Sequence, residues 1–168
     1  KITVIGSGNV GSTIAYTLTV RGIASEIVMI DLNEEKSLGE ALDIRQGVSF
    51  CSPASVYAGS YADAADSDIV VITSGMARKP GQSRLELAQC NVDIIKSIAD
   101  KIVPVAPNAT YVIVSNPVDI LTYVFLKHTG LPQERVIGSG TVLDTARLRS
   151  RISEYYNVSQ NNVHAYVL

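Results

Sequence analysis

The apolar residues of this 168-residue chain form short β-branched runs that alternate with stretches of helical periodicity. A run such as "DIVVITS" is apolar at consecutive central positions, which is typical of a parallel strand that is covered on both faces. The pattern predicts strands at Ile2–Ile5, Glu26–Ile30, Ser55–Ala58, Ile69–Thr73, Thr110–Val114 and Arg135–Gly138, with a further candidate at Val163–Val167. It predicts helices at Val10–Arg21, Glu34–Gln46, Leu85–Val103, Val118–Thr129 and Val142–Tyr156. This alternation indicates an α/β fold with a doubly wound parallel sheet and helices on both faces.

Composition narrows the class of protein. Hydrophobic residues make up 46% of the chain and charged residues 18%, which is ordinary for a globular domain with a sizeable core. The net charge of −2 does not suggest a nucleic-acid partner, and no apolar run reaches the roughly 18 residues of a membrane span. Cys51 and Cys90 have neither metal-ligand spacing nor the number needed for a disulfide framework. We therefore expect a cytoplasmic protein without a metal site, a nucleic-acid partner or a membrane partner.

Both ends of the chain lie in apolar, strand-like segments. Lys1 leads directly into "KITVIG", and the sequence stops at "VHAYVL". Natural domains usually close with a cap, a turn or a polar tail, so we expect a fragment of a longer protein.

The segment "VIGSGNVG" follows the first predicted strand and opens the first predicted helix. Its Gly6, Gly8 and Gly11 form a G-x-G-x-x-G pattern. In this context the first glycine permits a tight turn, the second lets the backbone approach a pyrophosphate, and the third allows close packing of helix and strand. The motif predicts dinucleotide binding by a Rossmann-type sheet; the alternative is a glycine-rich turn without a ligand.

Asp31 ends the second predicted strand, 20 residues after Gly11. A carboxylate at this place can bind the ribose 2′-hydroxyl of a dinucleotide. The alternative role is a helix N-cap, and one residue could serve as both. Because Asp31 would repel a 2′-phosphate and Leu32-Asn33 supplies no cation, we expect NAD rather than NADP as the cofactor.

Three segments of the second half leave the carboxyl ends of predicted strands, where open parallel sheets bind their ligands: "TSGMARKPGQSR", "SNPVDI" and "GSGTVLDTARLR". Asp144 and Arg147 are three residues apart and share a face if helical, either as a ligand clamp or as a weak surface ion pair. Asn116 precedes Pro117 and is either a ligand-facing amide or the start of a turn. Together they indicate a site for a small carboxylate.

The segments "VIGSGNVGSTIA", "RKPGQSRLEL", "SNPVDILTY", "IGSGTVLDTARLR" and "VHAYVL" resemble the L-lactate/malate dehydrogenase family over essentially the whole chain, and bacterial L-lactate dehydrogenases most. The resemblance implies hydride transfer between NAD and C2 of a small 2-hydroxy or 2-keto acid. It also implies a full-length homotetramer or dimer. Residues 1–140 would form the NAD-binding domain, and residues 141–168 would begin a catalytic domain that is truncated before its catalytic histidine.

The resemblance also implies roles for individual residues. Arg84 and Asp144 would be catalytic, the first polarising the substrate carbonyl and the second orienting a histidine. Arg147 would grip the substrate carboxylate as a bidentate fork. The segment "GMARKPGQ" would be a lid that excludes water when it closes. The expected substrate-binding residues are Arg78, Arg84, Asn116 and Arg147. The expected cofactor-binding residues are Gly6, Gly8, Asn9, Val10, Gly11, Asp31, Thr73, Gly75 and Asn116.

The family's acid/base histidine follows the segment "HAYVL", and the chain stops at Leu168. His128 falls near the end of a predicted helix, and His164 lies upstream of the catalytic position. We therefore expect these 168 residues to bind NAD without dehydrogenase activity. A non-catalytic NAD-binding module remains an alternative.

The substrate prediction is divided. Most segments resemble lactate dehydrogenases, but Arg78 stands where those enzymes usually have Gln and malate enzymes have Arg to pair with a second carboxylate. Gln82 stands where lactate enzymes commonly have a Glu that repels dicarboxylates. We favour the lactate type, with malate dehydrogenase as the alternative. Arg149 and His164 match the pair that binds fructose 1,6-bisphosphate at a subunit interface in activated family members; the alternative is two unrelated surface cations.

Overall fold

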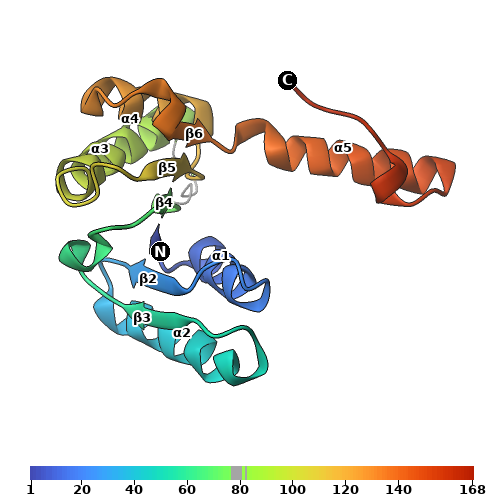
Figure 1. Cartoon of the computed structure of the whole chain (residues 1–168). Helices are drawn as coiled ribbons and strands as arrows, with labels where there is room; N and C mark the ends of the chain where they lie inside the picture. Colours follow the sequence, from blue (N-terminus) through green and yellow to red (C-terminus); the bar gives the residue numbers. More distant parts are fainter. Residues whose placement is uncertain (77–80, 82) are drawn as a thin grey trace.

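A computed structural model of the chain describes residues 1–76, 81 and 83–168. Its centre is one sheet of parallel strands in the order β3-β2-β1-β4-β5-β6 (Figure 1). The strands are β1 (Ile2–Ile5), β2 (Glu26–Ile30), β3 (Ser55–Ala58), β4 (Ile69–Ile72), β5 (Thr110–Ile113) and β6 (Val136–Gly138). The order reverses between β1 and β4, so the predicted doubly wound Rossmann-type sheet is confirmed.

The helices connect these strands. They are α1 (Asn9–Val20), α2 (Glu34–Gly47), α3 (Arg84–Ile102), α4 (Val118–Thr129) and α5 (Gly140–Tyr156). Every predicted helix is present, and the bounds differ from prediction by at most two residues. The described residues also include four short 3₁₀ segments that were not predicted: η1 (Val48–Phe50), η2 (Tyr61–Ala64), η3 (Gln133–Arg135) and η4 (Gln160–Asn162).

Each face of the sheet has its own core because consecutive strand residues point to opposite sides. In β1, Val4 packs with α1 and α2, whereas Ile5 packs with α3 and α4. The core on the side of α3 and α4 contains more buried residues than the other. It includes the ring pair of Tyr111 on β5 and Phe125 on α4, with ring centroids 5.0 Å apart. Burial raises the pKa of the Tyr111 hydroxyl to about 12. Because there is a core on each face of the sheet, the strands have apolar residues at consecutive positions of the sequence.

Helix ends follow local capping chemistry. Gly130 ends α4 in the left-handed conformation, at φ 65°, which costs glycine little. Ser83 caps α3 in a capping box, in which its hydroxyl accepts from the Glu86 N–H and the Glu86 carboxylate accepts from the Ser83 N–H. The Ser83 N–H, followed by its hydroxyl, holds the pKa of Glu86 below its ordinary value. These bonds fix the first turn of α3, whose first residue is Arg84.

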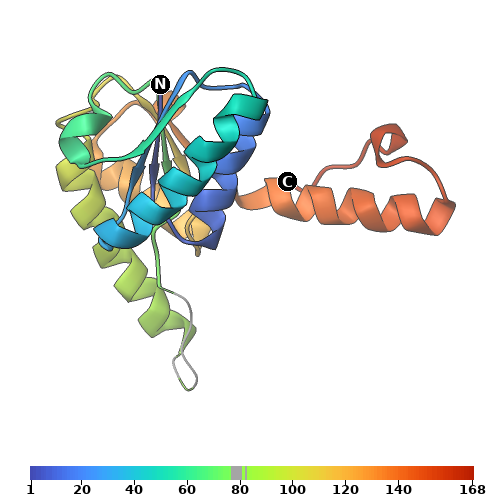
Figure 2. The same cartoon turned by 90° about the horizontal axis from the view of Figure 1, so that it is seen from below.

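The predicted strand at Val163–Val167 is wrong. This segment has no strand structure, and it lies with α5 away from the sheet in both views (Figures 1 and 2). A strand requires a neighbour to complete its hydrogen-bond ladder. The Val167 N–H instead donates to the Thr145 hydroxyl of α5, at 3.0 Å.

Within the described ranges, no helix has the length and apolar character that a membrane crossing requires.

The larger core yields a stability prediction. Phe125→Ala removes a fully buried ring and its contact with Tyr111, so we expect a loss of about 3–5 kcal/mol of unfolding free energy. The control Tyr123→Ala truncates a 62% exposed ring on the same helix and should cost less than about 1 kcal/mol. Urea unfolding of both variants measures the difference, and similar costs would contradict the assignment of the core.

Candidate functional site

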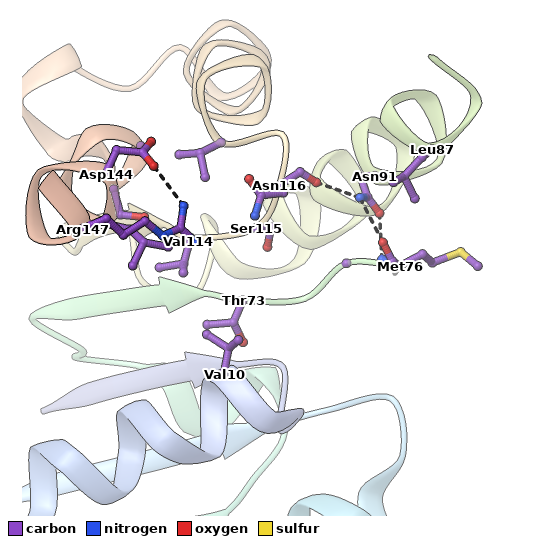
Figure 3. A pocket seen from close by; sticks show the side chains of 15 residues that line it. Val10, Thr73, Met76, Leu87, Asn91, Val114, Ser115, Asn116, Asp144 and Arg147 are labelled. Atoms are coloured by element: carbon purple, nitrogen blue, oxygen red, sulfur yellow. Dashed lines mark hydrogen bonds and ion pairs between the residues drawn. The ribbon is translucent and has the colours of Figure 1, made fainter. Parts of the chain in front are cut away.

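A cleft with a volume of ≈ 760 Å³ opens at the carboxyl ends of β1, β4, β5 and β6 (Figure 3). Among the predicted site residues, six line it: Val10, Thr73, Gly75, Asn116, Asp144 and Arg147. They come from four different connections between strands and helices, and the parallel topology brings them to one edge of the sheet. The cleft therefore joins the start of α1 to the start of α5.

The glycine turn is packed against the end of β4. Gly6 has φ +105°, and a Cβ there would lie 2.7 Å from the Thr73 hydroxyl oxygen. A Cβ on Gly11 would collide with the Gly6 carbonyl oxygen. The Thr73 hydroxyl donates to that carbonyl oxygen at 2.9 Å. Only glycine fits at these two positions: the backbone angle and the available space exclude a side chain at Gly6, and the available space excludes one at Gly11.

Gly8 differs from the other two glycines. A Cβ there would meet no heavy atom within 4 Å, so its space is open to a ligand. Gly8 is also the N-cap of α1 and provides no side-chain hydrogen bond to the first turn. The free N–H groups at the start of a helix attract phosphate oxygens. This arrangement fits a pyrophosphate above Gly8.

Asp31 lies at the end of β2 and is held by two backbone groups. One carboxylate oxygen accepts from the Ser7 N–H at 2.6 Å, and the other accepts from the Asn33 N–H at 3.0 Å. The N-cap of α2 is Asn33, whose side chain accepts from the Lys36 N–H, so the capping alternative for Asp31 is wrong. The two bonds fix the carboxylate beside the glycine turn, with lone pairs left for a further donor.

Two smaller cavities adjoin Asp31, with volumes of ≈ 450 Å³ on the α2 side and ≈ 270 Å³ on the α3 side. The second is an apolar slot between Leu32, Tyr61 and residues Ile94 and Ile98 of α3. Burial, and secondarily the charge of Asp31, raises the pKa of the Tyr61 hydroxyl, which keeps it neutral. A flat apolar group attached to a ribose would fit this slot.

Asp144 and Arg147 share one face of α5, as predicted. Arg147 Nη1 donates to Asp144 Oδ1 at 3.0 Å, and both side chains lie at the cleft (Figure 3). Their side chains are 55% and 68% exposed, so the ion pair contributes little to stability. Either group can therefore take another partner at small cost.

Sequence reasoning missed two buried polar residues of this cleft, Asn91 on α3 and Ser115 after β5. Asn91 bonds the backbone of Met76 and Asn116, and Ser115 bonds the backbone of Ser74. A signal for Asn91 was present, since helical spacing places it on the same face as the apolar Ile95 and Ile98. A polar residue on the buried face of a helix indicates a specific hydrogen-bonding role.

Several predicted residues cannot be placed in the cleft. Arg78 and Gln82, with most of the predicted lid, lie outside the described residues. For Arg84 the structure describes only the backbone, which is the first residue of α3. Arg149 lies farther along α5, where Nη2 donates to the Gln160 carbonyl oxygen at 2.9 Å; His164 is exposed. Their roles remain predictions.

The first 138 residues match the family model described as the lactate/malate dehydrogenase NAD-binding domain. The chain belongs to the lactate/malate dehydrogenase family. It carries this family's NAD-binding domain, and the glycine turn and Asp31 lie within the matched residues.

Curated relatives include L-lactate dehydrogenases from Thermoanaerobacter sp. (strain X514) and from Clostridium perfringens (strain SM101 / Type A). The first is 54% identical over 168 residues, which are 100% of this chain and 54% of the relative. The second is 49% identical over 168 residues, which are 100% of this chain and 53% of the relative. The chain thus spans about half the length of the curated relatives it matches.

Solved structures of lactate and malate dehydrogenases share the fold of this chain. A minor L-lactate dehydrogenase from Enterococcus mundtii in a ligands-bound form has a TM-score of 0.96 at 41% identity, covering 99% of this chain and 54% of that one. A malate dehydrogenase from Picrophilus torridus has a TM-score of 0.94 at 38% identity, and the match covers 99% of this chain and 53% of that one. The fold therefore does not distinguish the two substrates.

The open space at Gly8 yields a binding prediction. Gly8→Ala places a methyl group where the pyrophosphate would approach, so we expect the Kd for NADH to rise at least about tenfold. The unfolding free energy should change by less than about 1 kcal/mol. The control Gly39→Ala, at an exposed position of α2 that is equally open, should leave the Kd unchanged. Fluorescence titration measures both, and a parental Kd in Gly8→Ala would contradict the proposed phosphate position.

Proposed function

We propose that the natural protein carrying this chain is an NAD-dependent oxidoreductase of the L-lactate dehydrogenase type, which reduces pyruvate to lactate with NADH. The observation that carries the proposal is the cleft that joins Val10, at the start of α1, to Asn116, Asp144 and Arg147. The names of the curated relatives support the same substrate. Because the chain spans about half the length of those relatives, the activity is proposed for the whole protein.

The cofactor would lie across the carboxyl edge of the sheet. Its adenosine end would occupy the slot beside Asp31, its pyrophosphate would lie above Gly8, and its nicotinamide end would face Thr73, Gly75 and Asn116. Bound NAD supplies the hydride chemistry. The chain's own contribution is to orient the two reactants and to supply charge.

The substrate would lie between the nicotinamide end of the cleft and α5. Arg147 would bind its carboxylate with N–H groups beyond the one that Asp144 accepts. The Asn116 amide would help place the keto carbonyl, and the positive charge of Arg84 would stabilise the negative charge that develops on its oxygen. Asp144 would turn to orient the acid/base histidine.

We also propose that the 168 residues alone bind NAD without turnover. Neither His128 nor His164 is among the described residues that line the cleft. His128 lies in the last turn of α4, where its Nε2 bonds Asp100 of α3 at 2.7 Å, whereas the residue of α4 that lines the cleft is its first, Val118. In this proposal residues 1–140 form the NAD-binding domain, and residues 141–168, which include the extended α5, begin the catalytic domain that provides the histidine.

Steady-state NADH oxidation tests the proposal. We expect the natural protein to reduce pyruvate more efficiently than oxaloacetate, and the 168-residue chain to reduce neither at a comparable concentration. If the natural protein oxidised NADH with neither pyruvate nor oxaloacetate, the proposal would be contradicted. NADH binding without turnover would then support the alternative of a non-catalytic NAD-binding module.

Malate dehydrogenase is the second candidate, and Arg78 and Gln82 favour it. A charged contact between Arg78 and a second substrate carboxylate in a closed site outweighs most packing differences. Arg78→Gln in the natural protein should therefore raise the pyruvate-to-oxaloacetate ratio of kcat/KM at least about tenfold. An unchanged ratio would refute the specificity role of Arg78, whichever acid the parent prefers.

We further propose Arg149 and His164 as a site for fructose 1,6-bisphosphate at an interface of the full-length dimer or tetramer. Arg149 Nε is buried and has no partner among the described atoms, so the side chain has hydrogen-bonding capacity left. A guanidinium and an imidazolium suit a phosphate dianion. If the site exists, the bisphosphate should lower the KM for the keto acid of the parent but not of Arg149→Gln; no response in the parent would contradict it.

A further inference from the structure

We infer that the buried side chain of Asn91 is a positioning residue that holds the loops after β4 and β5 in one arrangement at the cleft. This inference rests on the proposed function for its catalytic consequence. The bonds that carry it are independent of that function: the Asn91 carboxamide joins the main chain at Met76 to the main chain at Asn116.

The backbone ladder between β4 and β5 ends just below these loops. The Val114 and Ser115 N–H groups both donate to the Ile72 carbonyl oxygen, at 2.9 and 3.3 Å. The Ser115 hydroxyl then donates to the Ser74 carbonyl oxygen at 2.6 Å. Beyond these bonds, within residues 1–76, 81 and 83–168, no backbone–backbone hydrogen bond joins the two loops. Any further link between the described parts of these loops therefore involves a side chain.

The Asn91 side chain provides such a link. Its Oδ1 accepts from the Met76 N–H at 2.8 Å, and its Nδ2 donates to the Asn116 carbonyl oxygen at 2.8 Å (Figure 3). A longer bond, of 3.4 Å, joins Nδ2 to the Met76 carbonyl oxygen. Only one orientation of the amide satisfies these partners, because an N–H must meet each carbonyl oxygen and an oxygen must meet the N–H.

The helix beneath makes the link rigid. Asn91 is 3% exposed, and the next turns of α3 are anchored in the core by Ile95 and Ile98. The loop lies directly on the amide, since a Cβ on Gly75 would be 3.5 Å from Asn91 Oδ1, an ordinary contact distance. A buried carboxamide with matched partners holds one geometry, and its loss leaves buried backbone groups unpaired.

The link bears on one end of the cleft only. Thr73, Gly75 and Asn116 would face the nicotinamide and the keto carbonyl, where a small displacement lowers the rate strongly. Asp31 is held instead by Ser7 and Asn33, on the other side of the switch point. Loss of the Asn91 link should therefore impair turnover much more than dinucleotide affinity.

Asn91→Asp in the natural protein tests this separation. The carboxylate can still accept from the Met76 N–H, but it faces two carbonyl oxygens without a proton to donate. We expect kcat/KM for the keto acid to fall at least about tenfold at about pH 8, with the Kd for NADH within about threefold of the parent. At about pH 6 the ratio of variant to parent should rise, because burial beside two carbonyl oxygens raises the pKa of the new carboxyl and the protonated form can donate.

The matched control is Asn108→Asp, the same change at an exposed position in the loop before β5; it should reproduce the parent at both pH values. An unchanged kcat/KM in Asn91→Asp would overturn the inference. So would an equal loss of NADH affinity, or a defect that does not vary with pH.

A second measurement does not depend on turnover. In Asn91→Ala the Met76 amide should exchange its hydrogen at least about tenfold faster, whereas the Val114 amide, which bonds Ile72, should keep its parental rate. An unchanged Met76 rate would overturn the link itself. If the link holds but the parent reduces no keto acid, the proposed function fails and the structural role of Asn91 stands.

Discussion

The contact between the glycine turn and the end of β4 is the constraint on which the rest of the molecule depends. Gly6 and Gly11 leave no room for side chains, and the Thr73 hydroxyl binds the carbonyl oxygens of Ile5 and Gly6. This contact closes the switch point between β1 and β4, where the sheet order reverses. It also directs the start of α1 into the cleft, so that helix N–H groups and the ends of β4 and β5 face the same space.

The carboxyl edge is divided between two sets of restraints. On one side, backbone N–H groups of Ser7 and Asn33 fix the Asp31 carboxylate. On the other, Ser115 and Asn91 fix the loops after β4 and β5. The Asp144–Arg147 pair comes from α5, which extends from the sheet and adds charged groups to the cleft (Figures 1 and 3). In the proposed function, cofactor affinity and substrate geometry would therefore change separately.

The fold was predictable because its information is local. Runs of β-branched residues and helical periodicity were enough to place each described helix and the sheet strands. The positions of candidate residues were predictable where a motif of fixed spacing meets a strand end, as at Gly6 and Asp31.

The errors share a different cause. The segment Val163–Val167 has the alternation of a strand, but pairing depends on a neighbour that sequence alone does not show. Asp31 and Asn33 are both plausible caps, and only the backbone path selects Asn33. The partners of Asn91 lie 15 and 25 residues away, so its role depends on packing between loops.

A structure of the protein with bound NADH tests the central claim most directly. The account predicts an extended cofactor, with adenosine in the slot beside Asp31, pyrophosphate above Gly8, and nicotinamide between Thr73 and Asn116. A cofactor bound elsewhere on the chain, or one that leaves the Gly8 backbone uncontacted, would contradict it.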